Sequence, residues 1–448
     1  MTTTTPIIRM NIGGAPEEFR REEVISASMV LQVDPTSAEL IASEVEFTIF
    51  STDPKYSIFS DGTYFSALSK RQPVLIYEQV GTAEIFLGRF FLEDWKAENE
   101  NQFWFKGYDL IGSLDYVKFD GRFWSSDTTF AEVVAIILEN LGIDYVILNG
   151  VGTTPLRGWL PPSTVREALQ QACFAAGAMI LSSRDQLEIG ASRFVVDLPA
   201  ASFLIDDARK KNQEELELLP LVTKISLVSH EYSQGTDLVT IFDQTLAPGN
   251  YKIVFEEPYY DVTATGAGAT VEDITTEDGV SLTTEDGITL VIEQEFVFGP
   301  NYVYLSVESP GGAVLIQGYP WVDSQQVHLY DAALGENVKE NQLEIKDATL
   351  ISPSNAQDVL DHLVDYYSQR YRQKITLLEL QFPTRYYGDP PAYGDGLYEG
   401  PGDAAINVGE ILESSTFKSK SILGVIEKLE IDLTGGFLID IENIGVED

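Results

Sequence analysis

Cysteine and histidine, the residues that most often supply nucleophiles and metal ligands, are scarce in this sequence. Cys173 is the only cysteine, so the chain can form no internal disulfide, and it lies in the run Gln171–Ala175, whose pattern is typical of an apolar helix face. His230, His328 and His362 are the only histidines and are widely separated. One thiol and three scattered imidazoles do not favour a zinc site or a Cys/His dyad, so we interpret Cys173 as a packed thiol.

Carboxylates are abundant and offer a second kind of chemistry. The sequence Thr-Thr-Glu-Asp-Gly occurs twice, at Thr275–Gly279 and at Thr283–Gly287. Clustered carboxylates can bind Ca²⁺, but neither repeat has the spacing of a known calcium loop. Asp-Gly favours the positive φ angles of tight hairpin turns, so we interpret the repeats as two turns and leave calcium binding as the alternative.

Motifs of established enzyme families are absent from the sequence. It contains no Gly-x-Ser-x-Gly elbow, no phosphate-binding loop ending in Lys-Ser or Lys-Thr, and no His-Glu-x-x-His. With 70 acidic residues, a pair that resembles a glycosidase dyad arises by chance. We therefore predict a protein that is not an enzyme, with no catalytic, cofactor-binding or metal-binding residues and no cofactor.

The overall charge limits the partners of the chain. Its 448 residues carry a net charge of -41, which repels nucleic acid and anionic membranes rather than binding them tightly. No stretch reaches the roughly 18 apolar residues of a membrane span. The start, Met1–Pro6, has neither a basic region nor an apolar signal core. We expect a protein made in a cytoplasm, which leaves the cell only as part of an assembly.

The elements that must position these residues are mainly strands. Up to about residue 112 the apolar residues alternate with polar ones, as in Glu44–Phe50, which is the period of a half-buried strand. Val74–Glu78 and Glu84–Gly88 predict a hairpin, and Phe90–Trp95 with Gln102–Tyr108 predict a second. Short strands with local connections fit a small β-barrel or sandwich.

The segment from about 113 to 195 has a helical component. Thr129 with Glu132, and Thr164 with Glu167, have the spacing of capping boxes, in which hydroxyl and carboxylate each satisfy a free backbone N–H at a helix start. Short apolar runs, such as Tyr145–Leu148, lie between and after the two predicted helices. This pattern predicts a compact α/β module.

The remainder of the chain is predicted to be β except for one helix. Val222–Val228 reads as a strand, residues 236–345 read as β throughout, and a helix is predicted to open at Pro353–Asn355. Tyr386–Asp403 has the composition of a loop that contacts a partner or of an ordinary surface loop, and Gly424–Leu433 alternates as a long strand. The predicted class is therefore mostly β with an α/β module, that is, α+β.

Three stretches resemble one protein family, the tail-tip and baseplate hub proteins of phages and phage-derived particles of Gram-positive hosts. They are Gly107–Asp115, Gly158–Ala178, and Gly424–Glu427 with Ile431–Phe437. Weaker similarities occur at Ala247–Gly249 with Glu256–Pro258, at Leu343–Ala348, and at Asn355–Arg372. The similarities extend over nearly the whole chain in the expected order, and the first hundred residues are the least diagnostic.

The resemblance implies an architecture. Hubs of this type form trimers in which each chain carries two tube-like β-barrels, so that three chains present a pseudo-sixfold ring to the hexameric tail tube. By this analogy residues 1–112 form the first barrel, and 113–195 form the α/β module. Residues 196–235 and 346–448 form a second, discontinuous barrel, and 236–345 form a β-rich insertion.

The resemblance also implies a function and partners. The chain would be a structural hub that adapts the tail tube to the central spike or tip and lets DNA pass. Its partners would be two further copies of itself, the tail tube or distal tail protein, the spike or tip protein, and the tape-measure protein. It would reside in the virion tail after assembly in the host cytoplasm. Contractile phage, flexible-tailed phage, tailocin and other contractile injection devices remain open, as does the host receptor.

Three alternative functions remain. A receptor-binding or carbohydrate-binding tail protein would use the loop Tyr386–Tyr398 and the all-β middle region. A tail-associated hydrolase would carry its enzyme as an additional domain. An unrelated acidic β-rich surface protein would be expected to have a signal peptide.

Overall fold

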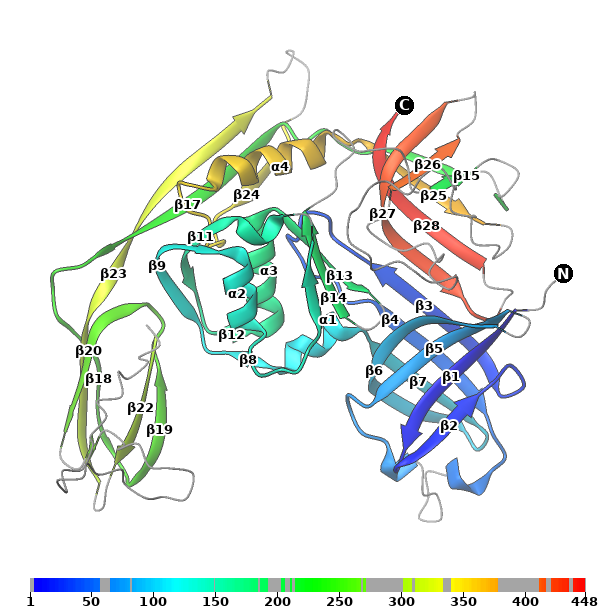
Figure 1. Ribbon diagram of the computed structural model, residues 1–448, viewed down its shortest axis with the longest axis horizontal. Helices are drawn as coiled ribbons and strands as arrows, with labels where there is room; N and C mark the ends of the chain where they lie inside the picture. Colours follow the sequence, from blue (N-terminus) through cyan, green and yellow to red (C-terminus); the bar gives the residue numbers. More distant parts are fainter. Residues whose placement is uncertain are drawn as a thin grey trace, which may run out of the picture.

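A computed structural model of the chain is mostly β, with few helices (Figure 1). It describes residues 4–56, 65–80, 83–148, 150–183, 186–191, 203–205, 210–211, 214–266, 269–270, 301–307, 311–332, 340–377, 411–415, 420–434 and 438–447. The prediction of a mostly β chain with a small helical module is confirmed. The two acidic repeats and the loop Tyr386–Asp403 lie outside the described residues.

The largest sheet has 13 strands and draws on both ends of the chain. Its N-terminal strands are β1 (Thr4–Ile12), β2 (Ala15–Phe19), β3 (Val24–Gln32), β4 (Glu44–Phe50), β5 (Pro73–Val80), β6 (Ala83–Asn99) and β7 (Gln102–Tyr108). Its later strands are β15 (Phe203–Ile205), β16 (Glu215–Leu218), β25 (Tyr371–Thr376), β26 (Ile411–Ser415), β27 (Ser421–Asp432) and β28 (Leu438–Glu447). Both predicted N-terminal hairpins are confirmed, as β5–β6 and β6–β7.

The two halves of this sheet meet where β27 pairs antiparallel with β3, with Leu429 opposite Leu31. The alternation of apolar and polar residues that the sequence predicts lets one face of each paired strand pack into the core. On β4 and β7 every second side chain turns inward, and the rings of Phe47 and Phe105 stack with centroids 4.9 Å apart. Leu429 is fully buried in the same apolar cluster. Burial of one such side chain contributes about 1.5–3 kcal/mol, so both ends of the chain stabilise one core.

The α/β module lies beside the large sheet (Figure 1). It contains α1 (Leu110–Ser113), β8 (Lys118–Phe119), β9 (Arg122–Thr129), α2 (Phe130–Ile137), β10 (Tyr145–Ile147), β11 (Pro155–Leu160), β12 (Ser163–Thr164), α3 (Val165–Ala176), β13 (Ala178–Ser183) and β14 (Gln186–Ala191). Both predicted capping boxes are present. The Thr164 hydroxyl accepts from the Glu167 amide at 3.1 Å, and the Glu167 carboxylate accepts from the Thr164 amide at 2.8 Å. Gly177 ends α3 with φ +61°.

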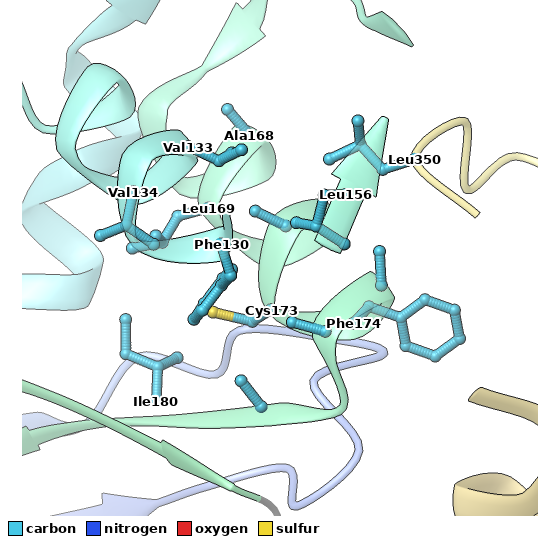
Figure 2. Packing of buried hydrophobic residues seen from close by; sticks show 14 of the residues in the cluster. Phe130, Val133, Val134, Leu156, Ala168, Leu169, Cys173, Phe174, Ile180 and Leu350 are labelled. Atoms are coloured by element: carbon cyan, nitrogen blue, oxygen red, sulfur yellow. The ribbon is translucent and has the colours of Figure 1, made fainter. Parts of the chain in front are cut away.

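Helix α4 (Ala356–Ser368), which the sequence pattern beginning at Pro353–Asn355 predicted, packs into the core of the module. Asn355 precedes the helix and donates through its side-chain amide to the Ala175 carbonyl at 3.0 Å, which attaches α4 to the end of α3. Figure 2 shows the apolar side chains of this core, including Phe130, Cys173 and Leu350.

The middle of the chain forms a separate β region at the far side of the module (Figure 1). One sheet contains β17 (Lys224–Gln234), β18 (Val239–Leu246), β20 (Tyr259–Gly266), β23 (Gly312–Asp331) and β24 (Gln342–Ile345), and a smaller one contains β19 (Gly249–Val254), β21 (Ala269–Thr270) and β22 (Tyr302–Val307). The sequence division grouped β17 with the C-terminal strands. Instead it pairs with β23 and β24, and its residues Ile225 and Leu227 are buried in the core of the module.

Candidate functional site

The single thiol has the environment that the sequence predicted. Cys173 is fully buried among the side chains of the module core (Figure 2). Burial raises the pKa of its thiol well above the usual range. The interpretation of Cys173 as a packed residue is therefore confirmed.

The histidines take separate structural partners. The Nδ1 atom of His230 lies 2.8 Å from Asp323 Oδ2, and its Nε2 lies 3.1 Å from the Lys346 carbonyl. His328 Nε2 lies 2.9 Å from Ser229 Oγ. The ring of His362 covers Gly177, whose missing side chain leaves it room. Within the described ranges no three His, Cys, Asp or Glu residues are grouped so as to hold a metal ion.

A buried polar contact lies at what we call the sheet junction, formed by β3, β27 and the end of α4. A β-bulge between Ile426 and Lys428 interrupts the register of β27 with β28, and Glu427 is the residue in this bulge. The Glu427 carbonyl accepts from the Val33 amide at 2.9 Å. The Glu427 carboxylate accepts from the Tyr366 hydroxyl of α4 at 2.6 Å. One residue thus connects both halves of the sheet to the helical part of the chain.

The surroundings of the Glu427 carboxyl and the Tyr366 hydroxyl at the sheet junction oppose the ionisation of both groups. Burial raises the pKa of the Glu427 carboxyl to about 7, against the hydrogen bond from Tyr366 and the charge of Arg372. Asp34 and Glu442 raise this pKa further through like-charge repulsion. Burial also raises the pKa of the Tyr366 hydroxyl. The junction is therefore a buried polar contact whose charge changes near neutral pH.

A second contact fixes the module against the large sheet through the loop 33–43, which connects β3 to β4. Ser37 in this loop is fully buried at φ +53°, and its hydroxyl donates to the Ala178 carbonyl at 2.8 Å. Arg166 of α3 donates through Nε to the Leu40 carbonyl at 2.7 Å and pairs with Asp115. The loop thus acts as a strap between sheet and module.

Sequence reasoning missed this strap and the sheet junction. The signal for the strap was present in Asp34, whose carboxylate accepts from the Thr36 amide at 2.8 Å and from the Glu39 amide at 2.9 Å, a pattern of a compact Asx turn. The sequence shows no comparable signal for Glu427, since its alternating strand pattern does not reveal the bulge.

Two further carboxyls are buried. Asp109 begins α1, where its side chain accepts from the Gly112 amide at 3.0 Å, and burial nevertheless raises its pKa to about 6. Glu78 on β5 is fully buried, and among the described residues neither of its carboxylate oxygens has a hydrogen-bond partner. Burial raises the pKa of Glu78 to about 7. Burial thus favours the neutral, protonated form of the carboxyl in both Asp109 and Glu78.

Known proteins resemble this chain in structure. No family model matches the chain, and no curated protein sequence matches it. A tail protein from Neisseria meningitidis is similar with a TM-score of 0.53 at 8% identity, covering 98% of this chain and 96% of that one. The 43 kDa tail protein of prophage MuSo2 from Shewanella oneidensis has a TM-score of 0.47 at 11% identity, covering 98% of each chain. The prophage tail protein gp18 from Listeria monocytogenes has a TM-score of 0.47 at 8% identity, covering 98% and 94%.

The Neisseria comparison shows that the chain has, over nearly its full length, the fold of a tail protein. The predicted resemblance to tail proteins is thus confirmed at the level of fold. None of the described helices is long and apolar enough to span a membrane.

Proposed function

We propose that the chain is a non-enzymatic structural hub of a phage-type tail tip or baseplate, resident in the virion tail. The observation that carries this proposal is the 13-stranded sheet, in which N-terminal and C-terminal strands join through β3 and β27. A single continuous sheet built from both chain ends suits a rigid ring segment. The tail-protein fold supports the same assignment.

The proposed ring contains three copies. Each half of the large sheet corresponds to one tube-like barrel: residues 1–112 form the first, and the strands in 203–218 and 371–447 form the second. β2 and β16 end the main path of the sheet, β15 ends a branch through β26, and each of the three pairs on one side only among the described residues. Three chains placed end to end would give six barrel units, which matches a hexameric tube.

The proposed partners are the tail tube or distal tail protein, the central spike or tip protein, and the tape-measure protein. The hub adapts the sixfold tube to the tip and lets DNA pass. The net charge of -41 supports passage, because carboxylates repel the phosphate backbone and do not hold it. The α/β module and the middle region would lie outside the ring as decorations.

Oligomeric state tests this proposal directly. Mass photometry of the purified full chain is expected to show a trimer, and negative-stain averages are expected to show a ring with a central opening. A monomer at every concentration and ionic strength would contradict the hub. A closed dimer would do so as well, because two copies supply four barrel units rather than six.

A further inference from the structure

A lysine, a glutamate and a glutamine meet in the half of the large sheet that is built from β15, β16 and β25–β28. Lys210 pairs with Leu377 in an isolated antiparallel bridge, Glu214 directly precedes β16, and Gln373 is on β25. Lys210 Nζ donates to Glu214 Oε2 at 2.7 Å, and Gln373 Nε2 donates to the same oxygen at 2.8 Å. One carboxylate oxygen therefore connects an amine with a carboxamide.

These three side chains are shielded from water. Those of Lys210 and Glu214 are each 5% exposed, and Gln373 is fully buried. The ion pair of Lys106 with Glu46, also at 2.8 Å, has side chains that are 21% and 39% exposed. Transfer of a proton from Lys210 to Glu214 removes two buried charges and leaves a neutral amine beside the carboxamide. Such an amine is a nucleophile, and the exclusion of water prevents competing hydrolysis.

The carbonyl oxygen of the same carboxamide faces a group that can stabilise negative charge. Gln373 Oε1 has no hydrogen-bond partner among the described residues. Asn443 lies directly opposite Gln373 on β28 and is fully buried, and its side-chain amide also has no partner within the described part of the chain. Directly opposed residues have Cβ atoms about 4.5–5.5 Å apart, so an Asn443 side-chain N–H can reach Oε1 as charge develops there.

We propose that Lys210 and Gln373 form an intramolecular isopeptide bond, with Glu214 as the catalytic acid and base. Glu214 takes a proton from the Lys210 ammonium, and the resulting amine attacks Cδ of Gln373. The Nζ–Cδ bond forms and the Cδ–Nε2 bond breaks. Glu214 gives its proton to the leaving Nε2 and takes the second proton from Nζ, which it passes to the departing ammonia.

The step balances without an oxidant or a reductant. The ammonium of Lys210 and the carboxamide of Gln373 yield one amide and one ammonium ion, and Glu214 ends as a carboxylate. Its Oε2 is suited to this shuttle because it lies within hydrogen-bond distance of both the attacking and the leaving nitrogen. No second carboxylate is needed to carry the protons.

The bond closes a part of the fold that is discontinuous in the chain. Lys210 precedes the middle region, and Gln373 follows both that region and α4. Unfolding that starts in the middle region therefore stops at the cross-link, and the strands beyond it stay joined. This inference concerns a single chain and does not depend on the proposed ring.

Mass spectrometry of the denatured full chain tests the proposal. The intact mass is expected to be lower, by one ammonia, than the mass calculated from the sequence. Digestion with a glutamate-specific protease and tandem mass spectrometry are expected to give one linked pair of peptides, one with Lys210 and the other with Gln373. The readout needs no ligand and no activity assay.

Variants then assign the roles. Lys210→Met and Gln373→Leu each remove one partner and should retain the full calculated mass. Glu214→Gln keeps the size of the side chain but cannot carry the proton, so it should slow formation of the bond by about 10²–10⁴-fold in a time course after synthesis. Lys106→Arg, in the exposed ion pair, is the matched control and should still lose one ammonia. Circular dichroism checks that each variant is folded.

Three outcomes overturn the proposal. An intact mass of the unmodified chain that equals the calculated mass at all times shows a buried ion pair only, whatever the variants do. A link from Lys210 to Asn443 shows that the electrophile is wrong. Unchanged formation of the bond in Glu214→Gln shows that Glu214 does not carry the proton. A chain that is cross-linked but monomeric counts against the hub and leaves this inference standing.

Discussion

The sheet junction and the β17–β23 pair are both built from long antiparallel strands, yet they place their apolar residues in opposite ways. At the junction Leu429 is fully buried, and Glu427 is hydrogen bonded to both a strand and a helix. On β23 Leu329 is 59% exposed. The same strand pattern therefore buries apolar side chains in one region and leaves them exposed in the other.

The largest expected loss of stability comes from shortening Leu429 at the sheet junction. Leu329 on β23 is the matched control. Leu429→Ala should lower the free energy of unfolding by about 2–5 kcal/mol, because it removes packed methyl groups and leaves a cavity. Leu329→Ala should change it by less than about 0.5 kcal/mol. Urea denaturation followed by circular dichroism measures both. Equal losses would remove the distinction between the two regions.

The second-largest expected effect is a pH-dependent change in the free energy of unfolding caused by Glu78. The folded-state pKa of Glu78 is about 7, above the ordinary value of 4.5, so the folded chain binds more protons between these values. Stability should therefore fall as pH rises from 4.5 to 7, and the full penalty of about 3 kcal/mol should apply above pH 7. Glu78→Gln should be more stable than the unmodified chain at pH 8, by up to that amount, and the gain should vanish near pH 4.5.

The control for Glu78 lies in the five-stranded sheet of the middle region. Glu344 on β24 is exposed, so Glu344→Gln should leave the free energy of unfolding within about 0.5 kcal/mol at both pH values. Chemical denaturation at pH 5 and pH 8 gives the comparison. A Glu78→Gln variant that is no more stable at pH 8 would contradict the burial argument.

The strap is expected to show a smaller effect. Arg166→Ala removes the donors to the Leu40 carbonyl and should cost about 1.5–3 kcal/mol, with faster hydrogen exchange in residues 33–43. Lys224→Ala on β17 alters an exposed pair with Glu340 at 4.0 Å and should cost less than about 1 kcal/mol. If exchange in the loop is unchanged in Arg166→Ala, the strap is held by other contacts.

The smallest expected effect is at the hydrogen bond of the sheet junction. Tyr366→Phe should cost about 1 kcal/mol near pH 8, and less at pH 5, where Glu427 is protonated. Tyr304→Phe changes a tyrosine that is 58% exposed and should have little effect at either pH. Identical losses at both pH values would show that the Glu427 charge is not involved.

Local patterns in the sequence predicted local structure well. The capping boxes at Thr129 and Thr164 form because their partners lie three residues away, within the reach of a single helical turn. The hairpin strands β5, β6 and β7 follow from alternation and short connections. Cys173 could be interpreted correctly because its neighbours are apolar at helical spacing.

Contacts between distant segments could not be predicted in the same way. The pairing of Leu429 with Leu31 joins strands nearly four hundred positions apart, and an alternating pattern does not identify its partner. β17 was grouped with the wrong strands because its pattern fits either sheet. His230 and His328 seemed isolated, although β17 and β23 bring them onto neighbouring strands. The resemblance to tail hubs predicted the tail-protein fold where local patterns could not.

The pairing of β3 with β27 also has a consequence for synthesis. A ribosome adds about 5–20 residues per second, so about 20–80 s separate the emergence of β3 from that of β27. During that time the β3 edge has only β4 beside it. A nascent chain of this protein should therefore depend on chaperone protection of an unfinished N-terminal sheet, and truncation before β27 should yield an aggregation-prone fragment.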